Sequence, residues 1–460
     1  MNNIAENVQK RIKGYLDLLW DKEGADDKSL KKYLVQGTTS SVGIRVTSIG
    51  LAFLSSVFWA RILGPEDYGI YNYVYAIISI LVIPTRLGLP RLLVREVAAY
   101  KVNKQWNYVK GILRRSNQFI SLSGLVLIVL CSAFLFLKPN FFEDPVLERT
   151  FWWSLPLLLI MPHLAIRAYA LRGLKEVVLS LVSERLIKSL VLVIVGVLVL
   201  LIGSDWFTPT SFMILVLVSF LLAFIYSIIS LHNKLPDEVH RTRPFYRTKE
   251  WVRAMWPFLL LGGLTVLNAR MDIVLLGILD TNKGVGLYQV AVKMGNMVTL
   301  VLASVNVVLG PLFSGLWTKQ NLVKMQIVLT KSTRAIFILT IPIGLVLIFG
   351  GEWILGLLFG EEYADAGMAL AILSVGYLFN AVMGSVGELL NMTGFEKYTA
   401  LALGISAVVN VLFNILLIPA YGIEGAAIAN LISVVTWNSF LGWFVFTKLN
   451  IVPSLFYSLK

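Results

Sequence analysis

Residues 117–137 read NQFISLSGLVLIVLCSAFLFL and contain no charged side chain. A transmembrane helix needs about 20 predominantly apolar residues to cross the hydrocarbon core of a bilayer. Arg114 and Arg115 precede the stretch and Lys138 follows it, so basic residues mark both of its ends. The stretch therefore predicts a membrane-spanning helix.

The composition extends this prediction to most of the chain. Of 460 residues, 57% are hydrophobic and only 15% are charged, whereas a soluble domain carries about 25% charged residues. Spanning segments satisfy their backbone in lipid as helices, and no alternating strands of a barrel are visible. We expect an all-α polytopic membrane protein with about 12 transmembrane helices. The predicted spans are 40–62, 71–93, 117–137, 151–172, 178–202, 209–231, 254–279, 286–314, 331–350, 366–390, 397–419 and 424–447. Pro84 and Pro90 lie in the second of these spans and predict a kink near Arg86.

Every second connection between these spans is basic. Lys and Arg number seven in the N-terminal segment, seven in 91–118, six in 232–253 and four in 315–334. The connection between the ninth and tenth spans instead holds Glu352, Glu361, Glu362 and Asp365. Basic loops stay in the cytoplasm, so we expect both termini there and a plasma or inner membrane location. The net charge of +13 then reflects these loops and anionic headgroups, not nucleic acid.

The longest polar connection divides the chain into similar halves. Gly69-Ile70-Tyr71 begins the second span, and Gly286-Leu287-Tyr288 begins the eighth, 217 residues later. Such an echo is expected of a parallel internal repeat, with an axis along the membrane normal. We predict a cytoplasmic amphipathic segment 1–39, a six-helix bundle 40–231, a basic cytoplasmic linker 232–253, a pseudo-symmetric six-helix bundle 254–447 and a cytoplasmic tail 448–460.

Several charged residues lie inside predicted spans, where each costs about 2.5–3.5 kcal/mol on insertion scales. Such groups usually face a cavity or a partner. Arginine binds phosphate bidentately, and lysine adds a point charge. We predict that the following residues line a cationic cavity between the halves: Arg45, Arg86, Arg270 and Lys293.

These charged residues also have alternative explanations that involve no ligand. Arg45 and Lys293 lie near span ends and could snorkel, as could Arg185 and Lys188. Asp272 is a candidate for ion coupling, or for a structural ion pair with Arg270. Other polar residues read as structural: His163 as a hydrogen-bonded packing residue, and Asn410 and Asn414 as hydrogen-bonding groups between helices.

Catalytic and cofactor motifs do not stand out. The sequence has no P-loop, one cysteine and three histidines without metal-ligand spacing. We expect no enzyme activity and no cofactor. A membrane-bound sugar transferase is disfavoured because the predicted exterior loops are short.

Residues 59–71, WARILGPEDYGIY, resemble the first helix–turn–helix of the Wzx-like oligosaccharide flippases. LLGIL at 275–279, VGLY at 285–288 and YGIEGAA at 421–427 resemble later elements of the same family, so the resemblance covers about 40–450. It implies membership of the superfamily that includes the MATE multidrug exporters and the lipid II flippase, with two bundles around an alternately opening cavity.

The resemblance also implies a function. Such proteins move polyprenyl-diphosphate-linked oligosaccharides from the cytoplasmic to the outer leaflet, for polysaccharide or glycan biosynthesis. The implied partners are this lipid-linked substrate, membrane lipids and a coupling ion, H⁺ or Na⁺. A MATE-type exporter of organic cations is the alternative, but it would favour acidic cavity residues, and bases predominate here.

Overall fold

The computed structural model describes residues 27–139, 141–203, 207–453 and 455, and within this part of the chain it is helical without strands. The predicted surface helix in the N-terminal segment falls within residues 1–26, outside the described part. The elements are α2 (Asp27–Arg86), α3 (Leu89–Val102), α4 (Trp106–Leu137), α5 (Pro145–Ser154), α6 (Leu157–Gly173), α7 (Val177–Leu181), a π-helix (Val182–Leu186), α8 (Ile187–Ile202), α9 (Pro209–Lys234), α10 (Asp237–Arg241), α11 (Thr248–Leu279), α12 (Asn282–Thr318), α13 (Leu322–Phe359), a 3₁₀-helix (Glu361–Ala366), α14 (Gly367–Met383), α15 (Val386–Met392) and α16 (Glu396–Leu449).

Ten helical stretches of the described chain are long and apolar enough to cross a membrane. The all-α polytopic prediction is therefore confirmed. Two of the ten, Gly43–Arg86 and Glu396–Leu449, contain 44 and 54 residues. At 1.5 Å per residue each exceeds twice the roughly 30 Å of the hydrocarbon core. Each covers two predicted spans, and the count of twelve crossings stays a prediction.

Local geometry shows that both long helices fold back on themselves. In α2, Gly64 adopts φ 71° and ψ 173°, which breaks the helix. Trp59 then stacks on Phe212 and Tyr71 contacts the same ring at a tilt, with ring centroids 4.3 and 4.4 Å away. In α16, Gly422 is non-helical, and an added Cβ at Gly425 would lie 2.4 Å from the carbonyl oxygen of Leu417. Both elements are helical hairpins.

The break after α2 was signalled by its prolines. The second predicted span, 71–93, is not continuous, because α2 ends at Arg86 and α3 begins at Leu89. Leu87 and Gly88 between them have positive φ values of 49° and 72°, and Pro90 lies in the first turn of α3. Proline fits the first turn of a helix but disrupts its interior, so the predicted kink near Arg86 is a full helix boundary.

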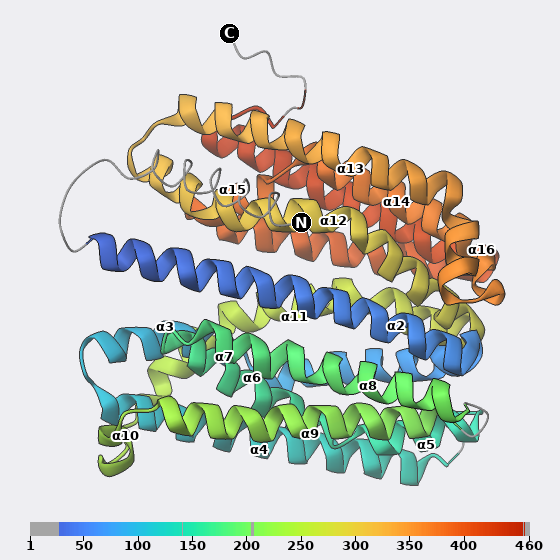
Figure 1. Ribbon diagram of the computed structural model, residues 1–460, viewed down its shortest axis with the longest axis horizontal. Helices are drawn as coiled ribbons and strands as arrows, with labels where there is room; N and C mark the ends of the chain where they lie inside the picture. Colours follow the sequence, from blue (N-terminus) through green and yellow to red (C-terminus); the bar gives the residue numbers. More distant parts are fainter. Residues whose placement is uncertain (1–26, 140, 204–206, 454, 456–460) are drawn as a thin grey trace.

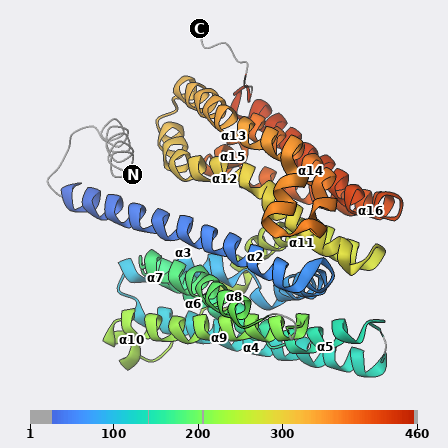
Figure 2. The ribbon, with the colours of Figure 1, turned by 45° about the vertical axis from the view of Figure 1, so that its right-hand side comes forward.

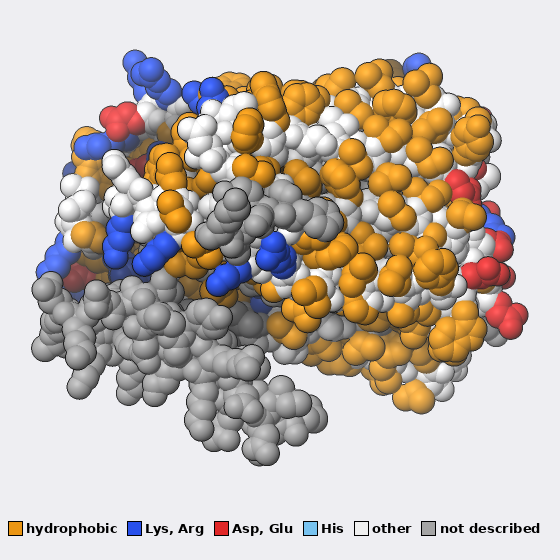
Figure 3. All heavy atoms as spheres, turned by 90° about the horizontal axis from the view of Figure 1, so that it is seen from above, with side chains coloured by type: hydrophobic (Ala, Val, Ile, Leu, Met, Phe, Trp, Pro, Cys, Tyr) orange, Lys and Arg blue, Asp and Glu red, His pale blue; other side chains and the backbone are white. Residues whose placement is uncertain are grey.

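Charge separates the two ends of the molecule. Figure 3 shows Lys and Arg gathered at the left end, Asp and Glu at the right, and hydrophobic side chains between them. We call the first the basic end; it holds the turns between α3 and α4, α9 and α11, and α12 and α13. The acidic end holds the turns between α11 and α12 and between α13 and α14, with Glu361, Glu362 and Asp365 exposed. This asymmetry matches the loop charges, while the cytoplasmic placement of the termini stays a prediction.

The chain forms two groups of helices. In Figure 1, α3–α10 lie in the lower part of the view and α12–α16 in the upper part, with α2 and α11 between them, and Figure 2 keeps this division. Helix α2 packs against both α8 and α12, and α11 packs against both α2 and α16. The predicted bundle limits at 40–231 and 254–447 stay a prediction.

The two echoed glycines meet where these groups join. A Cβ added to Gly69 would lie 1.7 Å from the carbonyl oxygen of Asn282, and one added to Gly286 would lie 1.9 Å from that of Pro65. The backbones of α2 and α12 therefore touch where only glycine fits. Close by, Arg61 Nε donates to the carbonyl of Leu358 at 2.7 Å. We call this contact the glycine seam; it lies toward the acidic end.

The predicted linker is docked rather than loose. The Phe245 amide donates to the Asn107 carbonyl at 3.0 Å, and Lys110 Nζ donates to the carbonyls of His240 and Thr242 at 2.7 and 2.9 Å. The segment between α9 and α11 is thereby attached to the start of α4.

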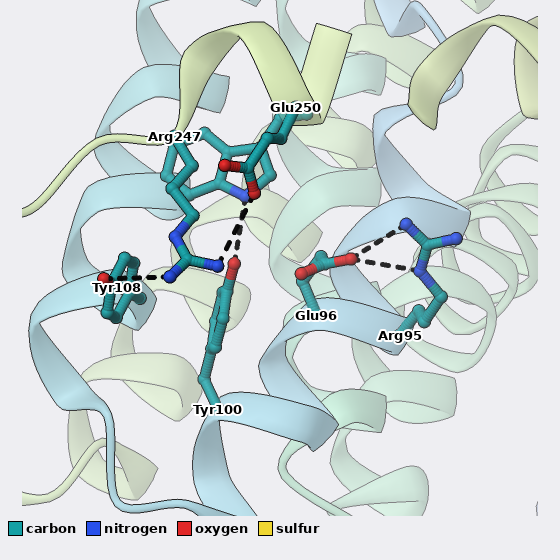
Figure 4. A network of polar contacts seen from close by, with 7 residues as sticks. Arg95, Glu96, Tyr100, Tyr108, Arg247 and Glu250 are labelled. Atoms are coloured by element: carbon teal, nitrogen blue, oxygen red, sulfur yellow. Dashed lines mark hydrogen bonds and ion pairs between the residues drawn. The ribbon is translucent and has the colours of Figure 1, made fainter. Parts of the chain in front are cut away.

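A second network attaches the start of α11 to α3 and α4 (Figure 4). Arg247 donates to the Tyr108 hydroxyl at 3.2 Å and pairs with Glu250 at 3.5 Å. Trp251 Nε1 donates to the Tyr100 hydroxyl at 3.1 Å. Burial raises the pKa of Tyr100 to about 12, so this hydroxyl stays protonated at neutral pH. The first turn of α11 is thus attached to α3 and α4 of the N-terminal group of helices.

Candidate functional site

A cavity of about 190 Å³ lies between α2, α8 and α9, with one residue from α12. Aromatic rings, hydroxyls and two lysines line it, and no carboxylate does. The residues that matter below are Ser55, Trp59, Tyr68, Tyr71, Tyr75, Lys188, Ser189, Phe212, Phe220 and Lys293. Pockets with apolar walls and a few convergent polar groups are typical ligand sites. We call it the aromatic cavity.

Two of the predicted bases reach this cavity from the C-terminal group of helices. Lys293 Nζ donates to the Tyr68 hydroxyl and lies 5.1 Å from the centroid of its ring. The guanidinium of Arg270 lies 5.4 Å from the ring of Tyr75. Cations are attracted to aromatic faces at such distances. Lys293 lines the cavity directly, and Arg270 reaches one of its walls.

Lys188 is a further base in the cavity, and the sequence favoured snorkelling for it. Its ammonium lies 4.2 Å from the Phe220 ring and lines the cavity. It follows the π-helix Val182–Leu186 by two residues. A π-turn carries an extra residue and changes the direction in which the next side chains point. Apolar periodicity in the sequence did not reveal that turn.

The other two predicted bases, Arg45 and Arg86, do not line the cavity. Arg172 and Arg185 lie close enough to Arg45 to repel it electrostatically, and Arg86 and Arg185 act likewise on Lys188. Together they form a basic cluster on α2, α6, the π-helix and α8: Arg45, Arg86, Arg172, Arg185 and Lys188. Among the described residues, the carboxylate close to this cluster is Glu184, which pairs with Arg172. Arg86 Nε is buried without a hydrogen-bond partner.

The cluster therefore has more positive charge than its neighbours neutralise. It adjoins the aromatic cavity through Lys188, so cations lie both in the cavity and next to it. The structure places Arg45 and Arg86 on α2, near Arg185 and Lys188 respectively, and Arg270 and Lys293 on α11 and α12.

Asp272 has a separate, buried environment in the C-terminal group. Its side chain is 5% exposed. Oδ1 accepts from Nδ2 of Asn410 at 2.7 Å and of Asn414 at 2.8 Å. Oδ2 accepts from the Tyr288 hydroxyl and from Asn430 Nδ2, both at 2.8 Å. We call these five residues the Asp272 cluster.

Two sequence predictions are settled by these contacts. Asn410 and Asn414 do hydrogen-bond between helices, as predicted, and their acceptor is Asp272. The suggested ion pair between Arg270 and Asp272 is wrong: the structure directs Arg270 to Tyr75 and Asp272 to four uncharged donors, because residues at i and i+2 diverge on a helix. Asn430 was missed, although an amide inside an apolar stretch is a signal of the same kind.

In the described residues, no group of three His, Cys, Asp or Glu side chains could hold a metal ion. The Asp272 cluster has one carboxylate and three amides. The side-chain oxygens of its Asn410 and Asn414, Oδ1 in each case, are buried without hydrogen-bond partners.

Comparison with known proteins shows which family the chain resembles in sequence. The family model "Polysaccharide biosynthesis protein" matches residues 34–317. A relative from Haloferax volcanii, described as a probable low-salt glycan biosynthesis flippase, Agl15, is 26% identical over 86% of this chain and 80% of its own length. A second Haloferax volcanii protein, the probable flippase AglR, is 29% identical over 40% of this chain and 38% of its own length.

Solved structures show the same fold. The lipid II flippase MurJ in an inward closed conformation superposes with a TM-score of 0.71 at 17% identity, covering 88% of this chain and 87% of MurJ. An inward-facing multidrug MATE transporter gives a TM-score of 0.71 at 12% identity, covering 87% and 94%. The fold predicted from the resemblance is thus confirmed, and the chain belongs to the polysaccharide biosynthesis protein family of Wzx-like transporters.

Proposed function

We propose that this protein is a flippase that moves a polyprenyl-diphosphate-linked oligosaccharide from the cytoplasmic to the outer leaflet. The observation that carries the proposal is the positive charge in and beside the aromatic cavity, which has no carboxylate in its lining. A diphosphate needs cationic partners, and aromatic faces provide flat apolar surfaces for sugar rings. The relatives named as flippases of glycan biosynthesis support the same function.

In this proposal each base has a place on the route. Arg45 and Arg86, toward the basic end, receive the diphosphate from the cytoplasm. Arg270, Lys293 and the newly identified Lys188 hold it at the cavity. The polyprenyl tail stays in the lipid throughout, so membrane lipids and this substrate are the partners; the activity is transport, not catalysis.

The glycine seam supports alternating access. The hydrogen bonds that join α2 to α13 and the 3₁₀-helix lie toward the acidic end: Arg61 donates to Leu358, and the Tyr363 hydroxyl donates to the Ala60 carbonyl at 3.0 Å. With the acidic end outside, this arrangement is closed to the exterior. Substrate entry from the cytoplasm would be followed by rocking of the two groups and separation of the seam.

We further propose that the Asp272 cluster couples transport to H⁺ or Na⁺. Protonation would remove the charge that four donors now stabilise. A Na⁺ ion would instead require the amides to turn their oxygens inward, and amide orientation is free to reverse where the oxygens lack partners. Asp272 also favours the alternative of a cation exporter, but its donors enclose it, and it does not line the cavity.

The test is transport of a fluorescent polyprenyl-diphosphate oligosaccharide by the full chain in proteoliposomes. We expect Lys188→Gln, Arg270→Gln and Lys293→Gln each to lower the rate about tenfold, the effect of losing about 1.4 kcal/mol. The matched control is Lys324→Gln, an exposed lysine of α13, which keeps the wild-type rate.

Thermal unfolding of each variant verifies folding. Wild-type transport by all three cavity variants would refute the cavity assignment. Transport of organic cations, without movement of the lipid-linked sugar, would favour the exporter.

A further inference from the structure

A second, larger hollow lies on the outer surface of the N-terminal group, apart from the aromatic cavity. It has a volume of about 510 Å³ and lies between α4 and the turn that joins α9 to α10. Its polar lining comes from Lys110, Arg114, Asn117, Gln118, Ser121 and His240. Figure 1 shows α10 at the lower left, the basic end, with α4 and α9 running along the bottom of the view. We call it the α4 groove.

The α4 groove has unneutralised positive charge. Lys110 is fixed by two backbone carbonyls, which leaves one of its three N–H donors for a ligand. Arg114 is exposed and forms no ion pair within the described residues. The acidic residues of α10, Asp237 and Glu238, are exposed and do not line the groove. An anion entering here meets cations without competing carboxylates.

Polarity falls along the groove. From Lys110 to Ser121 the helix rises about 16 Å, passing from charged side chains to the amides of Asn117 and Gln118. The Ser121 hydroxyl lies 3.1 Å from His163 Nε2, which keeps the inner limit polar. Beyond it α4 presents exposed apolar side chains, Leu122, Leu125, Val126 and Val129. The groove thus runs from the basic end into the lipid-facing surface.

That gradient matches one kind of ligand. A soluble phosphate would use only the charged portion, whereas a phospholipid has a phosphate, then ester oxygens, then acyl chains in the same order. Basic pockets at the cytoplasmic side of membrane proteins bind anionic headgroups. We propose that the α4 groove binds the phosphate headgroup of an anionic phospholipid, with Lys110 and Arg114 at the phosphate and Asn117, Gln118 and Ser121 near its ester oxygens.

The location gives this lipid a structural consequence. Lys110 and His240 both line the groove, and Lys110 also holds the linker to α4 through the His240 and Thr242 carbonyls. A lipid phosphate bound at Lys110 adds a contact at the point where the linker docks. Bound lipid is therefore expected to raise the thermal stability of the whole chain.

The experiment titrates phosphatidylglycerol into the purified full chain in phosphatidylcholine nanodiscs and measures Tm. Phosphatidylglycerol is expected to raise Tm above the value in phosphatidylcholine alone. Arg114→Gln should weaken the apparent affinity about fivefold, the effect of losing one basic contact near a membrane surface. The control Lys324→Gln removes an exposed lysine beyond the groove, at the basic end of the other group, and should keep the wild-type titration.

A second groove variant ensures that the test does not depend on correct folding of Arg114→Gln alone. Gln118→Glu keeps an acceptor for Arg115, which donates to the Gln118 oxygen at 3.0 Å, but adds a charge that repels phosphate; it should lower the affinity at least as much as Arg114→Gln. Equal Tm in both lipids, or wild-type titrations by both groove variants, would overturn the proposal. The same Tm increase with soluble glycerol phosphate would show that a lipid is not required.

Discussion

The predicted internal repeat pairs residues of the aromatic cavity with residues of the Asp272 cluster. The 217-residue offset between the echoed glycines takes Ser55 to Asp272 and Tyr71 to Tyr288. The 221-residue offset between a second pair of glycines, Gly173 and Gly394, takes Ser189 to Asn410. The first half therefore has serines around an open space, where the second half has a carboxylate and an amide bonded together.

The two sites differ in the size and polarity of their side chains. In the first half, small hydroxyl side chains leave room between Tyr71, Trp59 and Phe212, and a cavity results. In the second, a carboxylate, amides and a hydroxyl hydrogen-bond to one another, which a buried carboxylate requires. We interpret the first as the place for cargo and the second as a fixed charge that responds to an ion.

The strongest test of this contrast removes the carboxylate. Asp272→Ala leaves the Asn410 and Asn430 amides and the Tyr288 hydroxyl without this acceptor, while the Asn414 amide keeps its bond to the Asn410 backbone carbonyl. Each buried donor left unsatisfied costs about 1–3 kcal/mol, so we expect the free energy of unfolding to fall by about 3–5 kcal/mol. The counterpart change, Ser55→Ala, should cost no more than about 1 kcal/mol. Chemical unfolding of both variants measures the difference, and comparable losses would remove the distinction between the two positions.

The two tyrosines paired by the 217-residue offset, Tyr71 and Tyr288, offer a second comparison with a smaller expected effect. Tyr288→Phe deletes one of the four hydrogen bonds to Asp272 and should lower the free energy of unfolding by about 1.5–3 kcal/mol. Tyr71→Phe removes a hydroxyl that borders the aromatic cavity, and its stability should stay near wild type. The same unfolding measurement applies, and an equal loss from both substitutions contradicts the assignment.

The glycine seam offers a test of how the two halves meet. Gly286→Ala forces a Cβ against the Pro65 carbonyl, an overpacking that costs about 1–3 kcal/mol and favours separation at the acidic end. To measure this separation, Ala60→Cys is introduced at the buried Ala60 in a Cys131→Ser background. The new thiol should react faster with a thiol reagent when Gly286→Ala is also present than when Gly286 is kept. Gly315→Ala is the control, because no atom lies within 4 Å of its added Cβ; a similar acceleration there would argue against a seam.

Sequence reasoning succeeded where a residue stands out against its own surroundings. The apolar spans and the Pro84 and Pro90 boundary each depend on composition along one stretch, which the sequence states directly. The resemblance in residues 59–71 predicted the family and its fold correctly.

The failures have a common cause. Lys188 near a span end has the sequence pattern of a snorkelling lysine, and only the π-helix and the neighbouring Phe220 place it in a cavity. Asn430 was not connected with Asp272, 158 residues away, because that contact depends on how separate helices pack. The helices packed against a helix decide which way each of its faces points, and a single sequence does not show which helices those are.

The glycine seam also bears on how such a chain arose. Gly69 and Gly286 are counterparts in the repeat, and each lies against the other's backbone, as in the isologous contact of a two-fold dimer. In that symmetry a single surface serves both sides, so one small residue suffices to let two copies approach. The seam thus has the two-fold geometry that the predicted internal repeat would give to two fused copies of one ancestral subunit.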